Sequence, residues 1–85
     1  YIIDSIGWAY YLIDNYVKAE KFLKRAVELM PNDPIVNDHY GDILWKLDRK
    51  IQARYFWTNV LTMDDIEKDE LEKINIKLIR GLENS

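Results

Sequence analysis

His39 is the only histidine of the chain and the residue best suited to acid–base chemistry, because imidazole titrates near neutral pH. Asp38 beside it and Asp42 three residues later could in principle orient it as a base or begin a metal site. Adjacent helical residues point about 100° apart, however, so Asp38 is poorly placed to orient the ring. The sequence has no second histidine, no cysteine and no glycine-rich phosphate loop. We therefore predict no catalytic residue, metal site or cofactor, and a structural or solvent-facing His39.

Composition and charge narrow the classes of partner. The 85 residues are 48% apolar and 32% charged, which is typical of a soluble globular domain or part of one. The net charge of −3 argues against nucleic acid or anionic membranes as partners, since both attract clustered Lys and Arg. The basic stretch 18–25 is interleaved with Glu20, and the stretch 49–54 precedes aromatic residues at predicted core positions. The longest near-apolar run, residues 6–13, is far below the about 20 residues that a membrane span needs. We expect no nucleic-acid binding and no membrane insertion.

The chain repeats itself with a period of 34 residues and no gap. Five pairs are identical between the two units: Asp4 with Asp38, Gly7 with Gly41, Asp14 with Asp48, Ala19 with Ala53, and Phe22 with Phe56. Apolar residues also match apolar residues along both units, from Ile2 with Val36 to Leu29 with Met63. A fixed period of this length indicates a stacked repeat architecture.

Each repeat unit has the apolar period of two helices. Apolar residues recur every three or four positions, which predicts helices over about 3–14, 17–30, 34–47 and 51–63. Asp14 and Asp48 fall in the turns, and Pro31 and Pro34 end the second helix. Asp33 before Pro34 is a strong start signal for the third helix, because its carboxylate can accept from free first-turn amides. Each unit is therefore predicted to be a helical hairpin.

The repeat ends after residue 65, and a fifth helix is predicted beyond it. Leu71, Ile74, Leu78 and Leu82 form its apolar stripe. Its other faces carry Asp69, Glu70, Glu72, Lys73 and Lys77. Asp64 with Glu67 three residues later predicts a capping box at its start. One apolar and one polar face suit the terminal cap of a stacked array.

The pattern of small residues and proline resembles that of the tetratricopeptide repeat, over roughly residues 1–67. The signature positions are filled by Gly7, Ala19, Ala26 and Pro31 in the first unit and by Gly41 and Ala53 in the second. Ile3 and Leu23 stand where the family favours Trp and Phe, and Asn37 and Asp65 depart from the second-unit pattern. Small residues let the paired helices approach closely, and larger ones would overpack the contact.

The resemblance implies an all-α fold of two helix-turn-helix hairpins stacked right-handed, with a C-terminal capping helix. The expected segments are 1–33, 34–65 and 66–83, at the C-terminal end of a longer repeat protein. Richness in Ile, Lys and Asn is associated with AT-rich bacterial genomes, so we expect a bacterial source. The compartment stays open between cytoplasm and periplasm, because a chain without cysteine suits both.

Repeats of this family are usually non-enzymatic scaffolds that bind proteins or peptides on a concave face lined by the first helices. The resemblance places seven residues on that face: Asp4, Trp8, Tyr11, Asp38, Asp42, Trp45 and Lys46. We call these the predicted groove residues. The first helices sum to −4 and the second helices to +4, so the groove side is expected to be acidic. An acidic groove would repel the carboxylate tails that one subclass of the family binds.

We therefore expect a basic or aromatic-containing protein segment as partner, with Trp8, Tyr11 and Trp45 as stacking or cation–π surfaces. In the alternative interpretation, these aromatic residues pack against a neighbouring repeat or the capping helix. A second function also stays open: the segment could be a structural terminus that caps a longer array or self-associates, with recognition by upstream repeats.

Overall fold

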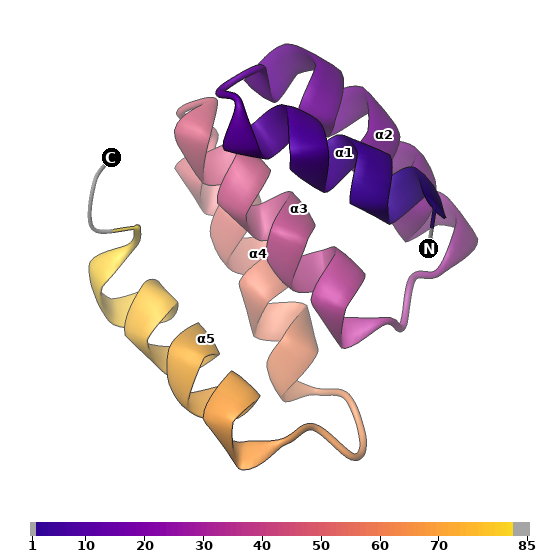
Figure 1. The fold of residues 1–85 in the computed structure, drawn as a ribbon. Coiled ribbons are helices and arrows are strands. Elements are labelled where there is room, and N and C mark those ends of the chain that lie inside the picture. The colour runs from indigo at the N-terminus through magenta and orange to yellow at the C-terminus, as the bar shows by residue number, and fades with distance from the viewer. Residues whose placement is uncertain (1, 83–85) are drawn as a thin grey trace.

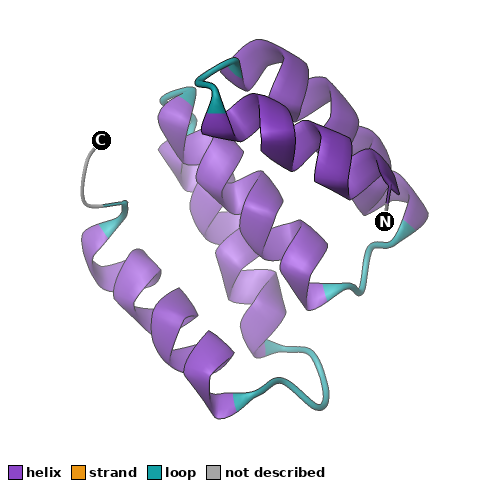
Figure 2. Cartoon of the chain, viewed as in Figure 1, coloured by secondary structure: helices purple, strands orange, loops and turns teal. Residues whose placement is uncertain are grey.

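The computed structural model describes residues 2–82, and these residues fold into five α-helices without any strand (Figures 1 and 2). The helices are α1 (Ile2–Leu12), α2 (Tyr16–Leu29), α3 (Pro34–Lys46), α4 (Lys50–Leu61) and α5 (Lys68–Arg80). The predicted all-α class and the number of helices are confirmed. The predicted segment boundaries fall in the loops after α2 and α4, while the outermost predicted positions, 1 and 83, lie outside the described residues.

The first four helices pair as two hairpins, α1 with α2 and α3 with α4. The hairpins pack together chiefly through α2 and α3, and α5 packs on α4. In Figure 1, α5 therefore lies on the opposite side of the second hairpin from α1. α3 therefore packs against both α2 and α4.

The turns within the two hairpins repeat the same geometry. Asp14 and Asp48 both have a positive φ, 63° and 61°, and follow the ends of α1 and α3. The amide of Asp14 donates to the Tyr11 carbonyl at 3.0 Å, and Asp48 donates in the same way to Trp45 at 3.0 Å. These bonds satisfy carbonyls that the helix ends would otherwise leave unpaired. Two aspartates 34 residues apart thus have the same structural role.

At the start of α3, two side chains fix the loop that joins the two hairpins. Asp33 caps α3 by accepting from the Val36 amide at 3.0 Å, as predicted. Asn37 is buried, and its Nδ2 donates to the carbonyls of Pro31 at 3.0 Å and Asp33 at 2.8 Å. The amide therefore fixes the loop between the hairpins to the first turn of α3.

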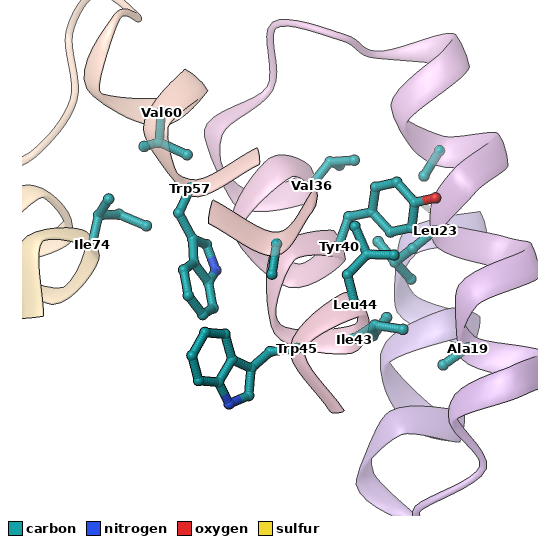
Figure 3. Close-up of a cluster of buried hydrophobic side chains, with 12 residues drawn as sticks. Ala19, Leu23, Val36, Tyr40, Ile43, Leu44, Trp45, Trp57, Val60 and Ile74 are labelled. Carbon is teal, nitrogen blue, oxygen red and sulfur yellow. The ribbon is translucent and has the colours of Figure 1, made fainter. Parts of the chain in front are cut away.

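A single core runs through both hairpins to α5. It includes the fully buried Leu23, Ile43, Leu44, Trp57 and Ile74, drawn in Figure 3. The two helical glycines permit the close contacts within each hairpin: a Cβ at Gly7 would overlap the Leu23 side chain, and one at Gly41 would overlap the Trp57 ring. The packing function predicted for these glycines matches this geometry.

The start of the fifth helix differs from the prediction. Asp64 begins no capping box; the N-cap position is Glu67, whose side chain makes no cap hydrogen bond. Residues 62–67 instead form the connection from α4 to α5, with Asp65 at a positive φ of 59° and Ile66 packed against the core. The capping-box prediction was wrong because these residues are needed to reach the docking position of α5.

Candidate functional site

A lysine from α5 lies between two aspartates of α3 that are among the predicted groove residues. Lys77 Nζ donates to Asp38 Oδ1 at 2.6 Å and to Asp42 Oδ2 at 3.2 Å. Both aspartates are only 6% exposed. As like charges four residues apart on one helix they would repel each other, so the lysine resolves a conflict that the sequence of α3 creates.

Trp57 of α4 completes this cluster. Its indole nitrogen donates to Asp42 Oδ1 at 3.1 Å, and Lys77 Nζ lies 6.0 Å from the centre of its ring. Asp42 thus accepts from an indole and an ammonium at once. The arrangement holds a lysine by two carboxylates and an aromatic ring, the combination that favours recognition of a cation.

Burial shifts the ionisation of the carboxyl groups in this cluster. It raises the pKa of Asp42 to about 6, with Lys77 opposing the shift and Asp38 adding to it. Burial, followed by the hydrogen bond and charge of Asp38, also raises the pKa of Glu70 on α5. Burial alone would lower the pKa of Lys77, but Asp42 and Asp38 outweigh it and raise that pKa. The lysine therefore stays charged, while Asp42 has a pKa of about 6.

The first hairpin repeats part of this arrangement with different chemistry. Asp4, the equivalent of Asp38, lies 3.0 Å from His39 Nδ1 of α3. Trp8 stacks on the His39 ring, with centroids 3.8 Å apart, and on Tyr11, with centroids 4.4 Å apart. Tyr11 is half-buried, and burial, then the charge of Asp42, raises its pKa. Asp4 of α1 therefore contacts a side-chain nitrogen of α3, just as Asp38 of α3 contacts one of α5.

Trp45 lies beneath the end of α5. Trp45 is 8% exposed, and its ring lies 5.5 Å from the Trp57 ring, centroid to centroid (Figure 3). A Cβ on Gly81 would overlap the Trp45 ring, so the backbone of α5 ends directly on it. Lys50 Nζ also lies 4.8 Å from the ring centre.

The predicted groove residues thus separate into two sets. Asp38, Asp42 and Trp45 are buried against α5, which matches the alternative in which Trp45 packs on the capping helix. The remaining members are partly exposed: Asp4, Trp8, Tyr11 and Lys46. The open part of this face is therefore formed mainly by the Tyr11–Trp8–His39 stack with Asp4.

Two members of the cluster, Glu70 and Lys77, were not predicted to belong to a site; their positions had been assigned to the polar faces of the fifth helix. The spacing of Glu70, Ile74, Lys77 and Gly81 is itself helical, so these residues share one side with the apolar stripe. That spacing could have revealed the lysine that neutralises Asp38 and Asp42.

The described residues contain no group of three or more His, Asp or Glu side chains that could hold a metal ion. None of the helices within residues 2–82 is long and apolar enough to cross a membrane. His39 has its Nδ1 against Asp4 and its ring against Trp8, which gives it a packing role.

Comparisons of the chain with models of protein families, with curated proteins and with solved structures gave no match.

Proposed function

We propose that this protein is a non-enzymatic interaction module of the tetratricopeptide-repeat type, which binds a basic or aromatic-containing protein segment along the face formed by α1 and α3. One observation carries the proposal: the chain's own Lys77 binds between Asp38 and Asp42 and beside Trp57. α5 therefore acts as an internal example of the ligand chemistry that this face accepts.

The partner segment would contact the part of the face that α5 leaves accessible. Trp8 already stacks on Tyr11 and His39, so contact would involve the edges and outer parts of the stack. Lys77 offsets only one of the acidic charges on the first helices, which leaves a negative field that attracts a basic segment.

The proposal is tested with two short synthetic helical peptides, one carrying lysines and a tryptophan and the other carrying glutamates in place of the lysines. Calorimetric titration should detect binding of the lysine peptide alone, weakening with salt. Trp8→Ala should weaken that binding about fivefold or more, whereas the control Tyr55→Ala, at an exposed site on α4, should not. The proposal fails if Trp8→Ala lowers thermal stability but leaves the affinity for the lysine peptide unchanged.

A second candidate function, a structural terminus of a repeat array, is favoured by a different observation. The side of α1 that faces away from α3 carries exposed apolar residues, including Ile2 and Ile6. If the chain self-associates through this surface, size measurements at high micromolar concentration should detect a dimer; a monomer there would remove the support for self-association.

A further inference from the structure

The interface of α5 with the rest of the molecule is less apolar than the equivalent interface of α3. α5 packs on α4 as α3 packs on α2, and the bounds of the two helices differ by 34 residues. In α3, Val36, Tyr40 and Ile43 are at most 5% exposed and belong to the core. The same positions in α5 are Glu70, Ile74 and Lys77. Two of these three are charged, so α5 buries less apolar surface than α3 and gains less from the hydrophobic effect.

The face beneath α5 requires a helix of particular chemistry. Lys77 is 15% exposed and supplies the cation that the two buried aspartates of α3 need. Ile74 is fully buried and points toward Trp57 in Figure 3. Gly81 lies so close to the Trp45 ring that a Cβ would overlap it. The face therefore combines a site for a cation, a site for an apolar side chain and a ring that only glycine can approach.

Glu70 weakens the docking of α5. Its Oε1 is buried and has no hydrogen-bond partner among the described residues, which costs the desolvation energy of that atom. Burial, then the hydrogen bond and charge of Asp38, raise the pKa of Glu70, so its ionised form is disfavoured in this position. A helix with an uncharged residue here would avoid both costs.

The start of α5 also lacks a stabilising contact that α3 has. Asp33 caps α3 by accepting from the Val36 amide at 3.0 Å. The N-cap residue of α5 is Glu67, whose side chain makes no such bond. Because an N-cap bond satisfies a first-turn amide, its absence makes α5 a less stable helix than one with a capping side chain. α5 thus carries the groups that this face binds, but in a helix that another helix can surpass.

We propose that α5 is an internal ligand, which an amphipathic helix of a partner protein displaces from the face formed by α3 and α4. The partner helix carries a lysine in the place of Lys77, an apolar residue three positions before it and a glycine four positions after it. It carries an uncharged residue in the place of Glu70. This inference rests on the cation preference of the proposed function, but it places the ligand beneath α5 and not on the Trp8 stack.

The test uses a fluorescent peptide of residues 66–82 with Glu70→Gln, titrated into the full chain and followed by anisotropy. Gly81→Ala in the chain should increase the affinity about tenfold, because the peptide binds only molecules whose own α5 is displaced. Lys77→Met in the peptide should weaken binding about tenfold or more, since two buried carboxylates then lack a cation. The matched control Lys73→Met in the peptide removes the same charge from a residue that is 63% exposed, and should change the affinity about twofold or less.

Amide exchange of the isotopically labelled chain measures the displacement itself. Saturation with unlabelled peptide should accelerate exchange in the chain's own α5 and leave α2 unchanged. Trp8→Ala in the chain should leave the affinity for this peptide unaltered, so that failure here and failure of binding at the Trp8 face are separate results.

Three outcomes would overturn the inference: the peptide binds neither the parent nor the Gly81→Ala chain, the two lysine substitutions weaken it equally, or it binds while the chain's own α5 keeps its protection. A dimer of the parent chain that exchanges α5 between its subunits would also overturn it, because the face would then receive a second copy of the chain and not a partner protein.

Discussion

Lys77 of α5 and Asp38 of α3 lie 39 residues apart in the chain and are joined by a hydrogen bond of 2.6 Å from Nζ to Oδ1. The repeat equivalent of Asp38 is Asp4, which pairs with His39 in the same direction along the stack. These two equivalent aspartates therefore connect α1 to α3 and α3 to α5. The two aspartates have different partners, His39 and Lys77, because the sequence of α3 follows the 34-residue repeat and that of α5 does not.

Replacing Lys77 by methionine should destabilise the protein by about 3 kcal/mol, because two buried carboxylates then lose their counter-charge. Urea denaturation followed by circular dichroism measures this loss. The control Lys73→Met alters a lysine that is 63% exposed, so its effect should stay within about 0.5 kcal/mol. Adding Asp38→Asn and Asp42→Asn to Lys77→Met should recover part of the loss. Wild-type stability of Lys77→Met would contradict the role given to this cluster.

The sequence allowed most of the fold to be predicted but little of this cluster. The period of 34, the Asp33–Pro34 start and the turns at Asp14 and Asp48 are local signals, and the corresponding helices lie within a few residues of prediction. Burial of Lys77 is a tertiary effect: its partners lie on another helix, so the local pattern around it reads as an ordinary solvated face. The conflict between Asp38 and Asp42 was visible in the sequence. The spacing of α5 places Lys77 beside its apolar stripe, but only the docking of α5 brings the lysine to these two aspartates.

Stability should increase as the pH is lowered from 8 to 5, because the folded protein holds a proton on Asp42 more tightly than the unfolded chain does. The pKa of Asp42 is raised from 3.8 to about 6, and that of Glu70 is raised as well. A raised carboxyl pKa gives stability that is present at low pH and is lost as the pH rises through the folded value. The contribution of Asp42 over this range is on the order of 1 kcal/mol.

Denaturant titrations at pH 5, 6, 7 and 8 measure this pH dependence. Asp42→Asn should flatten most of it, whereas the control Asp48→Asn, at an exposed turn, should leave the slope unchanged. A slope of the opposite sign between pH 5 and 7 would show that the burial of Asp42 does not control its ionisation.

Gly41→Ala should cost about 1–3 kcal/mol, since an added Cβ would overlap the Trp57 ring and overpack the α3–α4 contact. Displacing the ring would also weaken the 3.1 Å bond from Trp57 to Asp42. A double-mutant cycle with Trp57→Phe separates this coupling from helix propensity, because the smaller ring should tolerate the methyl group better. Additive effects of the two substitutions would rule out direct contact as the cause.

Gly81→Ala should selectively undock α5. Gly81 combines a φ of 70° with a ψ of −160°, a conformation that is essentially restricted to glycine, and its amide donates to the Lys77 carbonyl at 2.7 Å. Alanine at this position costs about 1–3 kcal/mol of backbone strain, and its Cβ would also overlap the Trp45 ring. Because the substitution acts at the end of α5, amide exchange should accelerate in α5 while that of α2 changes little. The control Asn75→Ala, at an exposed site within α5, should leave exchange unaltered. Equal acceleration in α2 and α5 would instead mean that α5 has no separate docking equilibrium and that the helix unfolds only with the core.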